Sequence, residues 1–286
     1  MTHDDMPVTA ANTLSKDYNF TPEHFELVRD ELYQFAGIVL ADHKINMVYN
    51  RLIRRIRALS LNNFDDYFCY LRETPAEHPL FINSLTTNLT AFFREKHHFD
   101  FIEQTILPEL AAAGQRRIRA WSAGCSMGEE PYSLAITLLN SAVDLSSCDL
   151  KILATDIDSN VLDSARSGIY PLERIESLPI SQPQRWFLKG TGANRGQVRI
   201  RPELQRLVTF NHLNLMHDWP MKGPFDFIFC RNVMIYFDKQ HQEKLLNRMA
   251  DLLKPGGYLF VGHSESLARQ QQRFRLIGNT IYQKER

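Results

Sequence analysis

At 286 residues, with 44% apolar and 23% charged residues, the chain has the composition of an ordinary globular protein and the length of about two domains. Lysine plus arginine equals aspartate plus glutamate at 33 each, which excludes a global charge field directed at nucleic acid or a membrane surface. No apolar run approaches the ~20 residues of a membrane span, and the polar start of the chain lacks the apolar segment of a signal peptide, so we expect a cytoplasmic protein without direct membrane insertion.

The cysteines are far apart in the sequence: Cys69, Cys125, Cys148 and Cys230. Structural zinc sites use close pairs of ligands, which this spacing does not provide. We therefore expect reduced thiols and no metal site.

Residues 1–19 are predicted to form a loose tail, and residues 20–74 a small all-α domain. Thr21 can cap a first helix, in which apolar residues recur at helical spacing until Gly37. Asn63 can cap the third helix of this domain.

The second helix, expected from about Lys44 to Leu59, has an apolar stripe on one side and a basic face on the other. The basic face consists of Lys44, Arg51, Arg54 and Arg55, with Arg57 at its edge. None of the three central arginines has an acidic residue three or four positions ahead that could neutralise it. The face is either an ordinary solvated surface or a docking face for an acidic partner, and we favour the docking face.

Residues 75–90 are expected to form a linker that includes a short helix from about Leu80, and residues 91–286 to form the second domain. Arg94 follows two phenylalanines at the start of this domain. An arginine in an aromatic setting is suited to gripping a carboxylate.

An apolar run ending at Ala123 leads into a loop with Gly124 and Gly128, and then into a helix. Glycines at such a junction let the backbone come close to a ligand. Glu129 and Glu130 stand at the helix start, where they would repel a pyrophosphate but suit a cation, such as the ammonium and sulfonium of S-adenosylmethionine. The alternative is a plain loop, in which both carboxylates only complement the helix dipole.

Asp156 follows the second predicted strand, which runs from Leu150 to Ala154. It lies roughly 30 residues past the glycine loop, where a ribose-binding acid belongs in a doubly wound sheet. Asp158 or Ser159 can cap the next helix, so one acid here has a purely structural use.

The stretch at about 168–205 is longer than a crossover between parallel strands needs. Two strand-like segments within it flank Gly190 to Gly196, which predicts a β-hairpin in an inserted antiparallel subdomain with an exposed strand edge. The continuous apolar run from Pro224 to Cys230 is typical of a central parallel strand. The second domain is therefore predicted to be α/β, with a doubly wound sheet.

Five motifs occur in order along the chain: Asn88-Leu89-Thr90-Ala91-Phe92-Phe93-Arg94, Gly128-Glu129-Glu130-Pro131-Tyr132, Phe229-Cys230-Arg231-Asn232-Val233-Met234-Ile235-Tyr236-Phe237, Leu253-Lys254-Pro255-Gly256-Gly257 and Gly262-His263-Ser264-Glu265. Together they resemble the chemotaxis receptor methyltransferases of the CheR type. The match covers nearly the whole chain from about residue 20.

The resemblance implies a Rossmann-like enzyme that transfers the methyl group of S-adenosylmethionine to glutamate side chains of chemoreceptors and releases S-adenosylhomocysteine. By motif match it assigns one set of residues to the cofactor: Asn88, Thr90, Arg94, Glu130, Asp156, Asn214, Leu215, Arg231 and Asn232. It also puts Tyr236 and Arg94 beside the transferring methyl group.

The partners that the resemblance implies are the cytoplasmic helices of transmembrane methyl-accepting chemotaxis proteins, with no role for nucleic acid. The resemblance assigns the docking of these helices to the basic face of the second helix, with Arg51, Arg54, Arg55 and Arg57. The hairpin is similar to a subdomain that captures the receptor's C-terminal peptide as an added strand, a contact we assign to Lys189, Gly190, Gly192 and Arg199.

Two other functions fit parts of the pattern. A dinucleotide-dependent oxidoreductase shares the strand, loop, helix and distal acid, but the two glutamates at the helix start speak against it. The second alternative function is that of a catalytically inactive receptor-binding adaptor on the same fold. The presence of Arg94, Asp156 and Tyr236 argues against an inactive protein.

Overall fold

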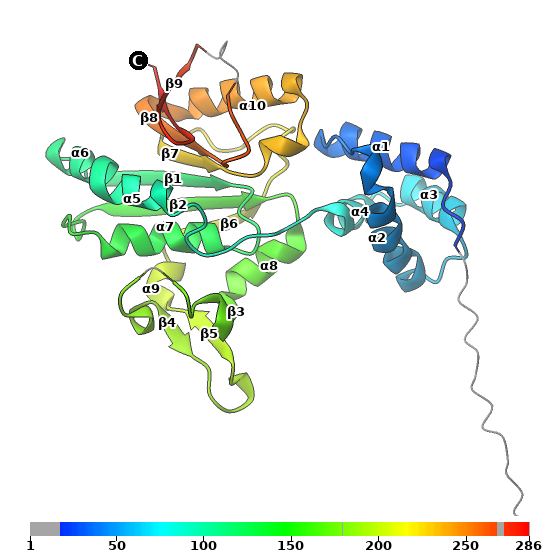
Figure 1. Ribbon diagram of the computed structural model, residues 1–286, viewed down its shortest axis with the longest axis horizontal. Helices are drawn as coiled ribbons and strands as arrows, with labels where there is room; N and C mark the ends of the chain where they lie inside the picture. Colours follow the sequence, from blue (N-terminus) through cyan, green and yellow to red (C-terminus); the bar gives the residue numbers. More distant parts are fainter. Residues whose placement is uncertain (1–17, 179, 268–271, 286) are drawn as a thin grey trace, which may run out of the picture.

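The computed structural model describes residues 18–178, 180–267 and 272–285. It contains a helical domain, a seven-stranded sheet covered by helices, and a small three-stranded sheet that projects from the larger unit (Figure 1). This architecture confirms the predicted doubly wound α/β fold with an all-α domain before it and an antiparallel insertion within it. Residues 1–17 of the predicted tail lie outside the described residues.

The N-terminal domain contains α1 (Pro22–Ala36), α2 (Ile45–Ala58), α3 (Phe64–Glu73) and α4 (Glu77–Leu85). The predicted caps are present. Thr21 accepts a hydrogen bond from the backbone N–H of His24, and Asn63 accepts one from the backbone N–H of Asp66. Gly37 ends α1 in the left-handed conformation, with φ at 69°.

The linker predicted for residues 75–90 is wrong over its first part, because α4 begins at Glu77 and belongs to the helical core. Phe81, Ile82 and Leu85 of α4 are buried together with the apolar faces of the other three helices. Pro79 made this stretch look like a linker. It lies in the first turn of α4, where a proline is tolerated because the first backbone N–H groups of a helix have no partner within the helix.

The large sheet has the strand order β6-β2-β1-β7-β8-β10-β9. Its strands are β1 (Arg117–Ala123), β2 (Asp149–Asp156), β6 (Val208–His212), β7 (Phe225–Cys230), β8 (Leu253–Val261), β9 (Phe274–Gly278) and β10 (Ile281–Lys284). The first five strands in spatial order run parallel to one another. Strand β10 is antiparallel to both of its neighbours, β8 and β9. The motif at residues 253–257 forms the irregular first part of β8.

Helices bury apolar residues on both faces of this sheet (Figure 1). One face carries α5 (His97–Phe101), a π-helical turn (Ile102–Ile106), α6 (Leu107–Ala112) and α7 (Glu129–Asn140), with α8 (Ser159–Ser167) at its edge, whereas α10 (Lys239–Leu252) packs on the other. Along β7, Phe227 and Phe229 face the first layer while Ile228 and Cys230 face α10. Burial on both faces explains the continuous apolar run of this strand.

The insertion consists of β3 (Ile169–Pro171), β4 (Phe187–Lys189), β5 (Gln197–Ile200) and α9 (Pro202–Gln205). The strand order β3-β5-β4 leaves β4 at one edge of this small sheet. The predicted hairpin around residues 190–196 joins β4 to β5.

The helical domain touches the loop that follows β7. Ile38 forms an antiparallel bridge with Phe237, and the backbone N–H of Val39 donates to the carbonyl of Tyr236 at 2.8 Å. The segment after α1 therefore helps to fix the loop that carries Tyr236. Among the described residues, no helix combines the length and the apolar character needed to cross a bilayer.

Candidate active site

A pocket lies at the carboxyl ends of β1, β2 and β7, the usual ligand position in doubly wound sheets. It encloses about 1060 Å³ of empty space, part of it open to solvent. The loop before α5, the glycine loop, and the loops after β6 and β7 converge on it. Ten residues expected from the sequence line it: Asn88, Thr90, Arg94, Glu130, Asp156, Asn214, Leu215, Arg231, Asn232 and Tyr236.

The glycine loop follows β1 and packs tightly against protein atoms. Gly124 has φ at 81°, and a Cβ there would stand 2.3 Å from the side chain of Val233. At Gly128, with φ at 96°, a Cβ would stand 2.9 Å from Ala165 of α8. We expected these glycines to make room for a ligand. Their close neighbours show that they also let the loop after β7 and helix α8 approach the floor of the pocket.

Asp156, the last residue of β2, supports the glycine loop as well as lining the pocket. Its carboxylate accepts hydrogen bonds from the backbone N–H groups of Ser126, at 2.8 Å, and Asp158, at 3.0 Å. Burial raises the pKa of this carboxyl group. Each oxygen retains a second lone pair, so the carboxylate can still accept from a ribose diol in the pocket.

Asp158 organises the neighbouring wall. It caps α8 by accepting from the backbone N–H of Asn160, and it also accepts from the side chains of Thr86 and Asn88. The Asn88 amide, which we expected to contact a cofactor, is thus hydrogen-bonded to Asp158 at 2.7 Å. This contact holds the segment between α4 and α5 against the start of α8.

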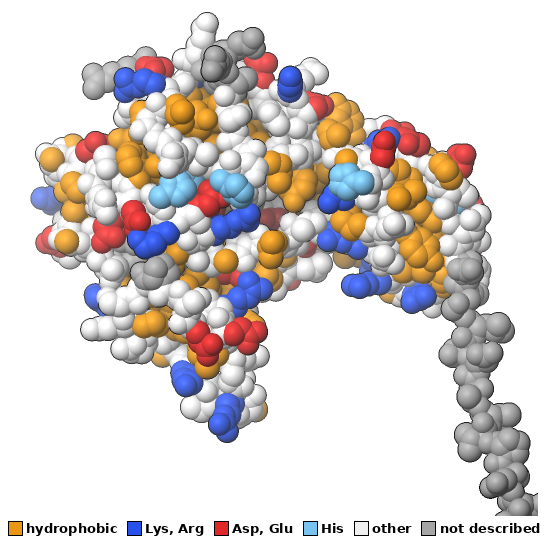
Figure 2. Space-filling view, viewed as in Figure 1, with side chains coloured by type: hydrophobic (Ala, Val, Ile, Leu, Met, Phe, Trp, Pro, Cys, Tyr) orange, Lys and Arg blue, Asp and Glu red, His pale blue; other side chains and the backbone are white. Residues whose placement is uncertain are grey.

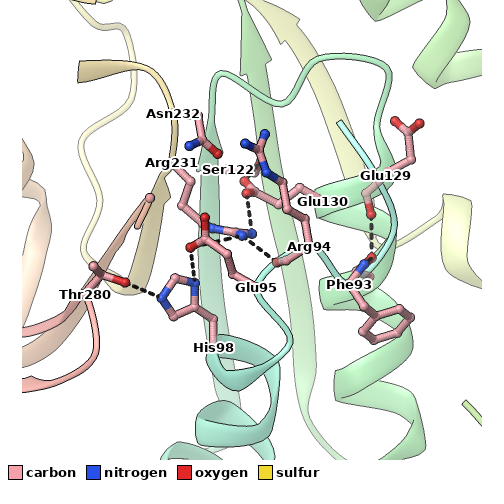
Figure 3. A network of polar contacts seen from close by, with 12 residues as sticks. Phe93, Arg94, Glu95, His98, Ser122, Glu129, Glu130, Arg231, Asn232 and Thr280 are labelled. Carbon is pink, nitrogen blue, oxygen red and sulfur yellow. Dashed lines mark hydrogen bonds and ion pairs between the residues drawn. The ribbon is translucent and has the colours of Figure 1, made fainter. Parts of the chain in front are cut away.

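Arg231 lies between two acidic side chains on the floor of the pocket (Figure 3). Its guanidinium group forms ion pairs with Glu130 at 3.1 Å and Glu95 at 3.4 Å. Glu130 also accepts a hydrogen bond from the hydroxyl of Ser122 at 2.6 Å. Burial raises the pKa of Glu130, and the guanidinium opposes that shift. A protein cation thus already neutralises much of the charge that we assigned to binding an ammonium group.

Glu129 does not share the position of Glu130. Figure 3 shows its carboxylate pointing away from Glu130 and Arg231, and the side chain is fully buried. Neither carboxylate oxygen has a hydrogen-bond partner among the described residues, and the guanidinium of Arg174 lies 3.7 Å away. Burial raises the pKa of Glu129. Only one of the two carboxylates at the start of α7 can therefore serve the pocket.

Arg94 and Tyr236 lie on two different loops at the mouth of the pocket. The Arg94 side chain donates to the carbonyl of Leu89 at 3.1 Å, and the Tyr236 side chain is 37% exposed. A guanidinium and a phenol at an open mouth are available to an incoming carboxylate. By contrast, the amide of Asn214 points toward the helical domain and donates to the carbonyl of Phe35 at 2.6 Å.

Glu95 and His98, which the sequence reasoning missed, lie behind Arg231 and do not line the pocket themselves. Thr280 donates its hydroxyl hydrogen to the carbonyl of Asn279, so its oxygen must accept from Nε2 of His98. Nδ1 of His98 is then an acceptor, 3.7 Å from Glu95. Burial and the charge of Arg231 lower the pKa of His98 to about 3, so the imidazole is neutral. The i, i+3 spacing of these residues directly after Arg94 was the available signal.

The same glutamate and two histidines, Glu95, His97 and His98, place their ligand atoms within 4.8 Å of one another. The guanidinium of Arg231 is 3.4 Å from Glu95 and would repel a metal cation at this point. The group is better explained as the support of Arg231 than as a metal centre.

The basic face of α2 is only partly available. Arg55 forms a two-point ion pair with Glu77 of α4, whose side chain is 2% exposed, and Arg51 donates to the carbonyls of Leu85 and Thr86. Our expectation that this face lacks neutralising partners is therefore wrong for Arg55. Arg54 is exposed, and basic side chains gather over α2 on the side of the bundle toward the small sheet (Figure 2).

The remaining predicted residues lie on the surface of the bundle and the insertion. Arg57 is exposed and stacks over Tyr18, and Lys189 and Arg199 are exposed on β4 and β5. Gly190 is required by packing, because a Cβ there would stand 2.1 Å from the carbonyl of Asn194. Gly192 lies at the open tip, with φ at 56°.

Two family models match the chain. The model described as CheR methyltransferase, all-alpha domain, matches residues 23–86, and that described as CheR methyltransferase, SAM binding domain, matches residues 88–283. Chemotaxis protein methyltransferase 2 of Pseudomonas aeruginosa is 49% identical over 271 residues, which cover 94% of this chain and 95% of that protein. The chemotaxis protein methyltransferase of Salmonella typhimurium is 52% identical over 262 residues (91% and 89%), and that of Escherichia coli is 50% identical over 265 residues (91% and 90%).

Proposed function

The chain belongs to the CheR family of S-adenosylmethionine-dependent methyltransferases, and we propose that it methylates glutamate side chains on the cytoplasmic helices of chemoreceptors. The observation that carries this proposal is the convergence of ten predicted site residues, distant in sequence, on one pocket. The product would be a glutamate methyl ester.

The residues of the pocket fit the cofactor. Asp156 has free lone pairs for the ribose diol, and Glu130 offers a carboxylate whose charge is partly balanced by Arg231. We propose that Asn88, Thr90, Arg94, Leu215 and Asn232 form the surrounding walls, and that Asn214 contributes mainly by joining the wall to α1. When bound, S-adenosylmethionine supplies an electrophilic methyl group on a positively charged sulfur.

The acceptor glutamate needs no general base. Its unperturbed pKa of ~4.3 makes it a carboxylate at neutral pH. Arg94 and the hydroxyl of Tyr236 steer this carboxylate at the mouth of the pocket, and neither exchanges a proton with it. Strong stabilisation of the carboxylate would slow the transfer, so the contribution of these residues is alignment and exclusion of water.

Receptor docking uses the exposed part of the basic face, with Arg54 as its main residue and Arg57 at the edge. The edge of β4 accepts the C-terminal peptide of a receptor as an additional strand, with Lys189 on β4 itself and Arg199 on the neighbouring β5. A tether of this kind raises the local concentration of the enzyme without changing the transfer step.

Transfer of labelled methyl groups from S-adenosylmethionine to receptor membranes tests the proposal. We expect base-labile label on receptor glutamates, a lower single-turnover rate for Tyr236→Phe, and a rate that is nearly independent of pH from about 6 to 8.5. Lys239→Gln, on the exposed start of α10, is the control.

Receptor binding without transfer of label would instead identify an inactive adaptor. A pH inflection in the parent that Tyr236→Phe abolishes would refute the alignment mechanism.

A further inference from the structure

Glu265 has no role in the function described above, although it ends the motif Gly262-His263-Ser264-Glu265. It follows β8 and is 5% exposed. We infer that Glu265 is the positioning residue of the loop 231–236, which carries Arg231, Asn232 and Tyr236 into the pocket. Its effect on the methyl-transfer rate rests on the proposed function, whereas its effect on the loop does not.

The carboxylate of Glu265 is the common acceptor of four backbone N–H groups. One oxygen accepts from Asn232 at 2.8 Å and Gly262 at 2.6 Å. The other accepts from Val233 at 2.9 Å and Ile235 at 3.2 Å. Both oxygens are therefore fully used, and a single side chain binds two separate segments of the backbone.

The loop needs such an acceptor because it follows a parallel strand and then leaves the sheet. Asn232 has φ at 59°, in the left-handed region, which turns successive backbone N–H groups toward one point. The backbone N–H groups of Tyr236 and Phe237 make only local bonds, to the carbonyls of Val233 and Met234. From outside the loop, Val39 donates to the carbonyl of Tyr236 and Gln242 to that of Met234, but both leave the N–H groups bound by Glu265 without another acceptor among the described residues. A buried carboxylate supplies what a neighbouring strand would otherwise provide.

The second segment is fitted to the same arrangement. A Cβ at Gly262 would stand 2.6 Å from the side-chain nitrogen of Asn232, 2.9 Å from its backbone nitrogen and 2.9 Å from Glu265. The absence of a side chain at Gly262 thus allows the end of β8 to approach the loop closely enough for the shared carboxylate. Displacement of this loop would move Asn232 and Tyr236 together.

Two variants separate an acceptor role from simple packing. Glu265→Gln keeps the size but replaces one oxygen with a donor, which faces two backbone N–H groups. Glu265→Asp is shorter but keeps both acceptor oxygens. At saturating S-adenosylmethionine and receptor, we expect the single-turnover rate to fall by about 100-fold in Glu265→Gln and by clearly less in Glu265→Asp. Glu243→Gln, exposed on α10, is the matched control and should retain the parent rate.

The outcomes are distinct. A packing role predicts the reverse order, with the glutamine variant more active than the aspartate variant, and that result, or equal rates in folded variants, would overturn the inference. A parent protein that transfers no label would count against the proposed function instead.

Amide hydrogen exchange tests the loop without any assay of activity. In the parent, the amides of Asn232, Val233 and Ile235 should exchange at least about 100-fold more slowly than in an unstructured chain. In Glu265→Gln they should lose this protection while the amides of β7 keep theirs. Fast exchange of the three amides in the parent would overturn the inference even if Glu265→Gln failed to fold.

Discussion

Replacing Asp156 should weaken cofactor binding and also loosen the glycine loop. The carboxylate accepts from the backbone N–H groups of Ser126 and Asp158, which are themselves buried at 9% and 2% exposure. In Asp156→Asn, one amide oxygen remains for these two donors, and the new NH₂ group faces the other. One buried N–H without an acceptor costs about 1–3 kcal/mol of unfolding free energy. In Asp156→Ala both donors lose their acceptor, so the cost is about 2–6 kcal/mol.

Binding of S-adenosylhomocysteine to Asp156→Asn should weaken by about 1–3 kcal/mol, which corresponds to roughly a 5- to 150-fold rise in Kd. Calorimetry at pH 7 measures the affinity, and urea unfolding measures the stability. Asp163→Asn, at an exposed ion pair on the neighbouring α8, is the control for an aspartate-to-asparagine change that leaves the pocket intact. A folded Asp156→Asn protein with the parent affinity would remove Asp156 from the cofactor site and refute the reasoning.

Three further predictions concern docking, the tether and pH. Arg55→Ala should lower the unfolding free energy by about 3 kcal/mol, because it leaves the buried Glu77 carboxylate without a cationic partner and only the Tyr67 hydroxyl as a donor. Arg54→Ala should leave the urea unfolding curve unchanged and raise the KM for receptors in a salt-dependent way. Equal behaviour of the two variants would contradict this division of the basic face. Gly192→Val should weaken binding of a receptor-tail peptide, because a β-branched residue is strained at a φ of 56°, and loss of S-adenosylhomocysteine binding in that variant would show that the hairpin serves the pocket instead. Because the pKa of His98 is lowered to about 3, the folded state binds fewer protons than the unfolded state between that value and ~6.5, so stability should fall as pH falls through this window. Between pH 7 and pH 5 the parent should lose about 2 kcal/mol more than His98→Gln in urea unfolding, and parallel pH profiles would mean that His98 is protonated in the folded protein.

Local features of the sequence determined much of the fold. The caps at Thr21, Asn63 and Asp158 depend on residues within a few positions along the chain, and the left-handed end of α1 depends on Gly37 alone. The alternation or continuity of apolar residues predicted the central strands and the hairpin. These signals are short in range, and for that reason they could be interpreted without knowledge of the neighbours.

The helix from His97 to Ala112 shows where such signals fail. Pro108 lies in it, at the start of α6, and a proline has no N–H to donate within a helix. The chain passes through a π-helical turn at Ile102–Ile106, which shifts the period of the apolar residues and so removes the sequence pattern of a single helix.

The motifs of the chain determined which residues gather at the pocket, but the tertiary structure alone decided what each side chain does there. Arg231 pairs with Glu95 and Glu130, Arg55 pairs with Glu77, and Glu265 accepts from the loop after β7, in each case across a long stretch of chain. The sequence alone does not distinguish a charged side chain that faces solvent from one that faces a ligand or a buried partner. The difference arises from burial, because removing a charge from water is so costly that the fold must provide the partner that neutralises it.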